Sequence, residues 1–508
     1  MRMRLLAGAD DRGPVVSAAA AASGVAVLLL TLPLGLPVFE VSVLVAAVVL
    51  AAVTYRTILQ WHVLLAFTIL VILFIPIKRY ALPGNLPLDL EPYRLVVAVI
   101  VAGWVTSLLV DPRVRIRASG FEGPVLLTLL AAVASAVANP GRISELGVQT
   151  EVLKGIMFLT SFLLVFYLIV SVIRTRELVD FLVKVLVAGG AGLAVFAVVE
   201  SRTGYNVFEQ LGSFLPFLRD ASVRTGEVLA RAGTLRVFAS AQTPISLGAA
   251  FVLLVPLAVY LTWRTKRWLW AAAGVLLVLG ALAPVSRTSI VMLLPVGLVF
   301  LWLRPRQTRR LWPLLVPIVC AAYIAVPGTL GSLKGAFFPA EGLIAQQTDN
   351  AGTTGSGRLA DIDPALEEWE AQPLLGQGYS TRQTGRENRQ ALILDNQWLK
   401  TLVETGVVGV FAWLWLYARF IRRLGAEAKL DPSPEGVLAA ALASSAAAYA
   451  AGMFFYDSFS FIQVTFLLYV LLGLGASLLR LSAAERSPAT QGSRRAAVPW
   501  RPQSSTPG

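Results

Sequence analysis

The sequence predicts an all-α polytopic membrane protein with about 14 transmembrane helices (12–14) and two long extracytoplasmic loops. Three observations lead to this fold class. The mean hydropathy is +0.71. Only 14% of the 508 residues are charged, whereas a soluble protein of this size carries about 25%. Apolar runs long enough to cross about 30 Å of hydrocarbon recur along most of the chain.

The runs fall into two sets of seven. The first set lies near residues 15–36, 38–54, 58–76, 93–110, 122–138, 152–172 and 178–199. The second lies near residues 241–262, 268–284, 288–303, 311–327, 396–418, 436–454 and 460–479. One or two of the runs are short for a membrane crossing, which needs about 20 residues, so the expected number of spans has a range.

The basic residues predict the orientation of these spans. Lys and Arg gather in alternate short loops, among them "DPRVRIR", "WRTKRW" and "RPRQTRR". Cytoplasmic loops carry such an excess, so we expect both termini to lie in the cytoplasm. Two long connections, about 200–240 and 328–395, then lie on the outer side. Long loops of this kind commonly carry binding or catalytic residues.

These features divide the chain into six parts. The Pro-, Ser- and Arg-rich composition of the last part predicts a disordered cytoplasmic tail. The parts are an N-terminal transmembrane bundle (1–200), an extracytoplasmic loop (201–240), transmembrane helices (241–327), a large extracytoplasmic loop with short helices (328–395), C-terminal transmembrane helices (396–480) and the tail (481–508).

The composition also excludes several kinds of site. One cysteine and one histidine exclude a disulfide framework, a cysteine-rich metal site and a multi-histidine zinc or iron centre. We therefore expect no metal ion and no cofactor. The net charge of +13 is spread over short loops, as membrane topology demands, so no nucleic-acid partner is expected.

Four arginines on the predicted outer side stand out, because an arginine near a span is costly without a partner. They are Arg231 and Arg236 just before span 241–262, Arg287 in a tight turn between two spans, and Arg358 in the large loop. Each guanidinium offers a planar fork of donors that suits phosphate oxygens, which favours a phosphate-bearing lipid as ligand. The alternative is that each arginine reaches lipid headgroups or caps a helix end.

The segment "LILDNQWLKTLVETGVVG" carries polar residues into the start of a span. At 100° per residue, Gln397, Lys400 and Glu404 fall on one helical face. Such a stripe needs a wet cavity or polar partners, so we expect these residues and Asn396 to line a cavity. Asp395 stands where a cap residue is expected, and a carboxylate at this boundary can also accept a proton from a sugar hydroxyl, so the two roles do not exclude each other.

Three further features concern the loops around this segment. Asp457, in another outer turn, either joins the same cavity or caps a helix. The Gly376-Gln377-Gly378 turn allows a backbone to approach closely. The stretch "DIDPALEEWEAQP" predicts an amphipathic helix with Asp363 as its N-cap.

Four stretches, in this order, carry a resemblance to a known family. They are "RAGTLRVFASAQTPISLGAAFVLLVPLAVYL", "SRTSIVMLLPVGLVFLWL", "GSGRLADIDPALEEWEAQPLLGQGYS" and "LDNQWLKTLVETGVVGVFAWLWLY". Through them the chain resembles the O-antigen ligase and Wzy-type polysaccharide polymerase superfamily of bacterial membrane proteins, over about residues 230–420.

The resemblance implies transfer of a glycan from an undecaprenyl-diphosphate carrier to an acceptor hydroxyl, on the outer face of the cytoplasmic membrane. It implies an inverting, metal-independent glycosyltransferase whose arginines hold the lipid diphosphate, here Arg231 or Arg236, Arg287 and Arg358. The partners would be a polyprenyl-diphosphate-linked glycan donor, a glycan or glycolipid acceptor, the lipid bilayer and envelope-assembly proteins.

The sequence departs from the ligase pattern at two places. Ligases carry a histidine, the proposed base, where this chain has "LDNQWL", and Asp395 is the nearest equivalent. The "HP" common after the first arginine motif is Thr243-Pro244 here. These departures favour a polymerase, or a transferase with another acceptor, over a strict ligase. A competing hypothesis is a transporter or flippase of lipid-linked oligosaccharide, which would use the same cationic cavity to carry the anion.

Overall fold

The structure is a computed structural model that describes residues 60–82, 91–110, 114–221, 230–231, 234–309, 312–326, 328–338, 342, 359–382 and 394–486. The chain forms two compact units, Met1–Phe67 and Thr68–Gly508. Of the first unit, residues 60–67 are described, and they include the first turns of helix α3 (Trp61–Phe74). The helices and the site described below lie in the second unit.

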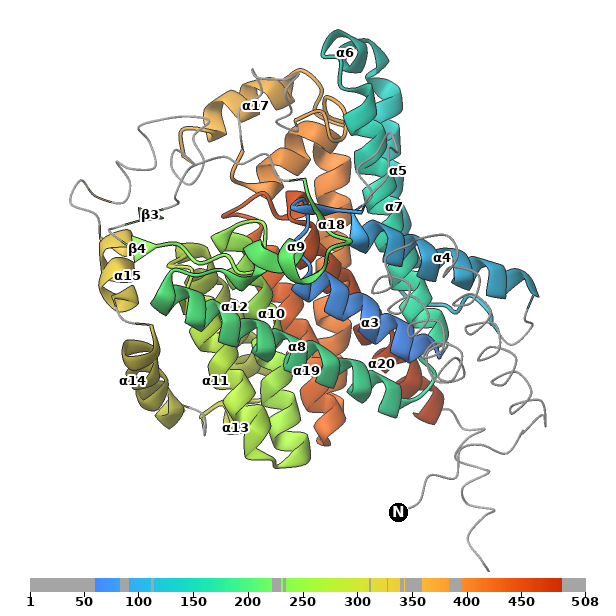
Figure 1. Cartoon of the computed structure of the whole chain (residues 1–508). Helices are drawn as coiled ribbons and strands as arrows, with labels where there is room; N and C mark the ends of the chain where they lie inside the picture. Colours follow the sequence, from blue (N-terminus) through green and yellow to red (C-terminus); the bar gives the residue numbers. More distant parts are fainter. Residues whose placement is uncertain are drawn as a thin grey trace, which may run out of the picture. The chain divides into compact units, whose positions relative to one another are not determined.

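Long helices dominate the second unit (Figure 1). Six of the described helices, α4, α7, α8, α10, α18 and α20, are long and apolar enough to cross a membrane. The long helices after α3 are α4 (Pro92–Val110), α5 (Glu122–Ala138), α7 (Gln149–Val172), α8 (Arg176–Thr203), α10 (Pro244–Thr265), α11 (Trp268–Leu282), α12 (Arg287–Leu303), α14 (Leu315–Ala325), α18 (Gln397–Leu430), α19 (Pro434–Gly452) and α20 (Ile462–Arg486).

The all-α membrane fold is therefore confirmed. The predicted spans 15–36 and 38–54 lie outside the described residues, and the other twelve coincide with helices. Since fewer of these helices are long enough to cross by themselves, the count of fourteen stays a prediction.

Short elements connect the long helices. They are α6 (Pro140–Glu145), η2 (Val207–Gln210), α9 (Leu211–Phe214), α13 (Pro305–Arg309), η3 (Trp312–Leu314), α15 (Thr329–Phe337), α17 (Ile362–Glu370) and η4 (Ser458–Ser460). Two antiparallel pairs of very short strands join loops: β1 (Tyr80–Ala81) pairs with β2 (Arg219–Asp220), and β3 (Ala230–Arg231) pairs with β4 (Thr234–Leu235).

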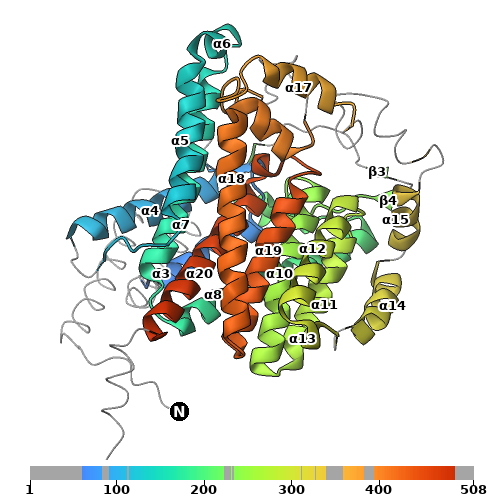
Figure 2. The same cartoon turned by 180° about the vertical axis from the view of Figure 1, so that it is seen from behind.

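The centre of the bundle is built from α10, α18, α19 and α20. Figure 2 shows α18, α19 and α10 side by side. Helix α19 is rich in alanine, and small residues let helix backbones approach closely. The hydroxyl of Ser445 in α19 donates a hydrogen bond of 2.7 Å to the carbonyl of Leu253 in α10. Such polar contacts stabilise helix pairs where lipid provides no hydrophobic driving force.

Several helix ends meet at one end of the bundle, here called the site end. The amide of Gln397, at the start of α18, donates a 2.7 Å bond to the carbonyl of Met453, just after α19. The amide of Ile462, at the start of α20, donates to the side-chain oxygen of Gln242, just before α10. Met292, near the start of α12, packs against Gly452 at the end of α19. The site end thus brings together the starts of α10, α12, α18 and α20.

Helix α18 is interrupted at Gly406, whose φ of 64° and ψ of −166° are not helical. The segment Pro373–Gly378 enters the break. The amide of Val407 donates to the carbonyl of Pro373 (3.0 Å), and the amide of Gln377 donates to the carbonyl of Val403 (2.8 Å). Backbone groups released inside a membrane protein need such replacement partners.

The predicted close approach at Gly376 is confirmed. Gly376 has a φ of 66°, and a Cβ on it would lie 2.5 Å from the carbonyl carbon of Glu404. Only glycine fits a position that combines a positive φ with a neighbouring backbone this close.

Two predicted boundaries are corrected. The amphipathic helix α17 begins at Ile362, so its N-cap is Asp361 and Asp363 lies in its first turn. Helix α20 continues to Arg486, into the predicted tail. An ion pair of 2.5 Å between Arg486 and Glu427 of α18 fixes this last turn. Hydropathy alone places the end of a helix too early when charged residues continue it beyond the apolar run.

Candidate active site

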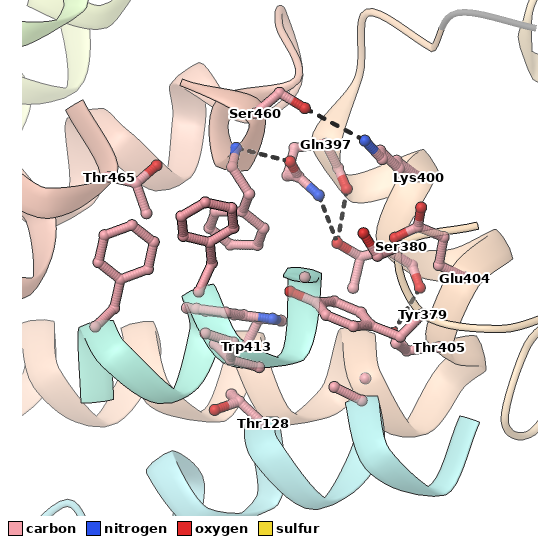
Figure 3. A pocket seen from close by; sticks show the side chains of 18 of the residues that line it. Thr128, Tyr379, Ser380, Gln397, Lys400, Glu404, Thr405, Trp413, Ser460 and Thr465 are labelled. Carbon is pink, nitrogen blue, oxygen red and sulfur yellow. Dashed lines mark hydrogen bonds between the residues drawn. The ribbon is translucent and has the colours of Figure 1, made fainter. Parts of the chain in front are cut away.

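A pocket lies at the site end between α5, α7, α18 and the start of α20 (Figure 3). Loop residues before α18 and between α19 and α20 complete its wall. The lining residues are Thr128, Ala132, Gly155, Phe158, Leu159, Phe162, Tyr379, Ser380, Gln397, Lys400, Thr401, Glu404, Thr405, Gly409, Trp413, Phe459, Ser460, Thr465 and Tyr469.

The polar stripe of α18 faces this pocket. Gln397, Lys400 and Glu404 all line it, and their exposed fractions are 2%, 7% and 3%. Spacings of three and four residues place the three side chains on consecutive turns of one helical face. Because each is buried, each has to be satisfied by polar partners rather than by bulk water.

Lys400 is paired across the pocket wall with the loop between α19 and α20. Its Nζ lies 2.8 Å from Oδ2 of Asp457 and donates a 3.4 Å hydrogen bond to Oγ of Ser460. The hydroxyl of Ser460 in turn donates to the same carboxylate oxygen. Asp457 precedes η4 but makes no side-chain cap bond there, and it is not among the lining residues. Its carboxylate instead binds Lys400 and Ser460, which do line the pocket.

Gln397 fixes the same loop from the other side. Its side-chain oxygen accepts a 2.9 Å bond from the amide of Phe459, and its side-chain nitrogen donates 3.2 Å to the hydroxyl of Thr401. The oxygen and the nitrogen of the Gln397 side-chain amide are therefore both hydrogen-bonded within the pocket wall. The loop between α19 and α20 is held to α18 by Gln397 and Lys400 together.

Glu404 lies two residues before the break in α18 at Gly406. Among the lining residues that the structure describes, it is the acidic one. Oε1 of Glu404 accepts a 3.3 Å hydrogen bond from the amide of Arg382, and its carbonyl accepts a 2.5 Å bond from the hydroxyl of Ser135 in α5. The break thus places a carboxylate next to the loop that carries Tyr379 and Ser380 (Figure 3).

A charged cluster lies behind this loop. Arg382 forms an ion pair with Glu368 of α17. Glu368 also forms an ion pair with Arg142 of α6, with 2.6 Å between Oε1 and the guanidinium nitrogen. Burial lowers the pKa of Arg382, whereas the nearby Glu404 opposes that shift. Guanidinium groups stay charged in proteins, so this arginine keeps its positive charge. The cluster ties α6 and α17 to the loop that forms the pocket wall.

Part of the pocket lining is aromatic. The rings of Trp413 and Phe459 have centroids 4.6 Å apart, and Phe162 stacks on Tyr469 at 5.3 Å. Phe158 and Leu159 add further apolar surface. The pocket is therefore amphiphilic, because charged and amide groups of α18 and aromatic rings line the same cavity.

The helix cap at the start of α18 is Asn396. Its side chain accepts a 3.1 Å bond from the amide of Leu399. The prediction that Asp395 caps this helix is therefore wrong, because α18 begins one residue later than that interpretation requires. Asp395 is buried, with 7% exposed, and it precedes the cap. Neither Asp395 nor Asn396 belongs to the pocket lining.

Two of the predicted arginines are described at the site end. Arg287 is the first residue of α12, and its exposed fraction is 9%. Arg236 is half-buried and lies in the segment that leads into α10. Neither contributes to the pocket lining. Arg231 lies in β3, with its side chain outside the described part, and Arg358 lies outside the described residues altogether.

Sequence reasoning missed the walls that α5, α7 and the loop residues contribute. Thr128, Gly155 and Phe162 belong to ordinary apolar runs, which look the same whether they face lipid or a cavity. Ser380 packs against Gly155, and the glycine in α7 was the one available signal of this close approach.

Comparison with known protein families finds a match over part of the chain. No curated protein matches the chain. The family model described as O-Antigen ligase matches residues 272–414, a stretch that contains Arg287, Lys400 and Glu404. The resemblance to the O-antigen ligase and Wzy-type superfamily is therefore confirmed, with residues 272–414 as the part of this chain that matches the O-antigen ligase family.

Proposed function

We propose that this protein transfers a glycan from a polyprenyl-diphosphate carrier to an acceptor sugar hydroxyl at the outer face of the bacterial cytoplasmic membrane. One observation carries the proposal. Buried charged and amide side chains of α18, within the family match, line a pocket together with several aromatic rings. A buried charge inside a membrane protein is costly, and such residues commonly mark a substrate site.

The amphiphilic pocket supports a lipid-linked substrate. Its polar groups, Gln397, Lys400 and Glu404, can hydrogen-bond sugar hydroxyls. Its aromatic part offers surface to sugar faces and to an isoprenoid chain.

The arginines would hold the diphosphate. Arg287 and Arg236 lie at the same end of the bundle, and Arg231 and Arg358 are further candidates from the sequence. Guanidinium forks bind phosphate oxygens in two-point contacts, which are strong where water is scarce. They would stabilise the charge that grows on the departing diphosphate, a task that other enzymes share with a metal ion.

The proposed reaction is a single displacement with inversion. The acceptor oxygen forms a bond to the anomeric carbon while the bond from that carbon to the diphosphate oxygen breaks. Asp395 accepts the proton of the acceptor hydroxyl. The electron pair of the broken bond leaves with the carrier diphosphate, which is a good leaving group, so no general acid is needed. Gln397, Lys400 and Glu404, which line the pocket, would surround the reacting sugars.

The acceptor that fits the sequence best is a growing polysaccharide, as in a polymerase, or another acceptor that strict ligases do not use. Asp395 stands where ligases carry a histidine, and this difference favours a polymerase-like activity. The positive-inside pattern supports cytoplasmic termini and a site on the opposite face, where envelope-assembly proteins would deliver the lipid-linked donor.

The test uses the purified full chain in lipid nanodiscs with a polyprenyl-diphosphate-linked oligosaccharide and a glycan acceptor, and mass spectrometry measures the new glycosidic bond. We expect Arg287→Ala to lower transfer at least about 100-fold and Arg287→Lys to recover part of it, because lysine keeps the charge and loses the fork. Arg306→Ala is the matched control, since Arg306 is exposed in α13.

Two outcomes would oppose the proposal. Equal transfer by wild type and Arg287→Ala would remove the arginine from the mechanism. Movement of the lipid-linked glycan across proteoliposome membranes without any new glycosidic bond would support the transporter hypothesis instead.

A further inference from the structure

A buried carboxylate lies at the site end of α8, away from the pocket. Glu200 is 7% exposed and lies near the last turn of α8. Its Oε2 accepts a 2.8 Å hydrogen bond from the amide of Ala239, and its Oε1 accepts a 3.3 Å bond from the amide of Phe238. A carboxylate placed in this way binds two successive backbone N–H groups of a segment 38 and 39 residues further along the chain.

Asn206 completes this clamp. Its side-chain nitrogen donates to Oε1 of Glu200 (3.3 Å) and to the carbonyl of Ala239 (3.0 Å). Its side-chain oxygen accepts from the amide of Phe208, which fixes the amide orientation. Ala239 therefore has both its amide and its carbonyl bound by side chains from the end of α8 and the loop that follows.

The clamped segment has an irregular backbone that needs such support. Ala239 has a φ of 45°, a conformation that costs energy for a residue with a Cβ. Val237, Ala239 and Ser240 are almost completely buried, with 1%, 2% and 1% exposed. On the opposite side, the side-chain nitrogen of Gln463 donates 3.2 Å to the hydroxyl of Ser240. The segment is thus held from α8 and from α20.

Arg236 is the first residue of the clamped segment, residues 236–240. It lies two residues before Phe238, whose amide is the first that Glu200 binds. We infer that Glu200 is a positioning residue for Arg236, an inference that rests on the proposed function of that arginine in binding the lipid diphosphate. The clamped amides of Phe238 and Ala239 set where the backbone of Arg236 lies. Two-point contact between a guanidinium and phosphate tolerates little displacement, and a misplacement of about 1 Å can cost about 100-fold in rate.

The chemistry of the clamp selects a carboxylate. Glutamate is an acceptor at both oxygens, and both receive N–H groups here. Glutamine has the same shape but one acceptor, so one backbone N–H would face an NH₂ group. Glu200→Gln should therefore loosen the segment without removing bulk from the core.

The experiment compares Glu200→Gln with Glu209→Gln, in the full chain and in the transfer assay described above. Glu209 is a carboxylate of the same region that pairs with Arg79 and has a 40% exposed side chain. We expect Glu200→Gln to raise the KM for the lipid-diphosphate donor about 10-fold with the acceptor KM unchanged. Glu209→Gln should leave both constants at the wild-type values. An equal effect of the two variants, or an effect of Glu200→Gln on the acceptor KM alone, would overturn the inference.

A double variant separates positioning from general stability. If Glu200 acts through Arg236, Glu200→Gln should cause less than a twofold further loss in an Arg236→Ala background. An undiminished 10-fold loss in that background would show a structural role only. Should Glu200→Gln fail to fold, Asn206→Ala tests the same clamp, because it removes the bond to the Ala239 carbonyl and leaves the carboxylate in place. It should raise the donor KM in the same direction, and an unchanged donor KM would overturn the inference.

Failure of the proposed function has a different signature. If Arg236→Ala leaves donor KM and transfer unchanged, the arginine does not bind the diphosphate and the proposal about Arg236 fails. If Arg236→Ala weakens donor use while Glu200→Gln and Asn206→Ala do not, only the positioning role of Glu200 fails.

Discussion

The amine of Lys400 lies 2.8 Å from the carboxylate of Asp457, and this partly buried ion pair joins α18 to the loop between α19 and α20. The side chains are 8% and 18% exposed, so little water screens them. Glu404 lies one helical turn from Lys400 on the same face. Lys400 is thus one cation near two carboxylates in the pocket wall. Substitution of Lys400 and substitution of Asp457 should therefore change the free energy of unfolding by different amounts.

Removal of the cation should destabilise the fold more than removal of Asp457. Lys400→Met leaves the buried Glu404 and the partly buried Asp457 without their shared cation, and leaving a buried charge without its partner costs about 3 kcal/mol in the free energy of unfolding. Asp457→Asn should cost less, because Lys400 keeps Glu404 nearby. Thermal unfolding of the purified variants in one detergent measures the order. A larger loss for Asp457→Asn would contradict the assignment of Lys400 as the shared cation.

The break in α18 gives a second prediction. Gly406 has a φ of 64°, and a Cβ on it would lie 2.2 Å from the carbonyl oxygen of Leu374. Gly406→Ala should therefore displace the inserted segment Pro373–Gly378 and yield little folded protein, as size-exclusion chromatography would show. The control is Gly297→Ala in α12, where no atom lies within 4 Å of the added Cβ. It should be neutral or slightly stabilising, since alanine is the better helix former.

A third prediction concerns metal removal. If guanidinium groups such as that of Arg287 carry the charge stabilisation, transfer by protein treated with EDTA should equal transfer in the presence of Mg²⁺. The assay is the mass-spectrometric transfer reaction, run with chelated and with metal-supplemented buffer. Loss of transfer in EDTA that returns when Mg²⁺ is added would show that a metal shares this task.

The helical membrane fold and the polar face of α18 could be predicted because both depend on local pattern. Hydropathy identifies spans, and a period of 100° per residue puts Gln397, Lys400 and Glu404 on one face. The extent of α18 could not be predicted, because residues 419–430 continue the helix beyond the apolar run. There the guanidinium of Arg423 lies 5.1 Å from the ring centroid of Phe121, a tertiary contact that hydropathy does not contain.

The partners of the site residues depend on contacts between distant segments. Asp457 meets Lys400 from 57 residues away, and Glu200 meets Ala239 from 39 residues away. Either carboxylate looks like an ordinary helix-end residue in the sequence. Asp395 and Asn396 are both good cap residues. The bond from the Gln397 amide to Met453 fixes where the helix begins and makes Asn396 the cap, and no local pattern contains that bond.

The last prediction separates the two carboxylates near the start of α18. We propose Asp395 as the proton acceptor, whereas Glu404 lines the pocket and is expected to hold a sugar. Asp395→Asn keeps the size of the side chain but cannot accept the proton, so kcat should fall by about 100-fold or more while the donor KM stays near wild type. Glu404→Gln should instead raise the acceptor or donor KM, with a smaller effect on kcat. Steady-state kinetics over a range of both substrates measures kcat, the donor KM and the acceptor KM of each variant. The reverse pattern, a collapse of kcat in Glu404→Gln with Asp395→Asn active, would move the proton acceptor into the pocket and assign it to Glu404.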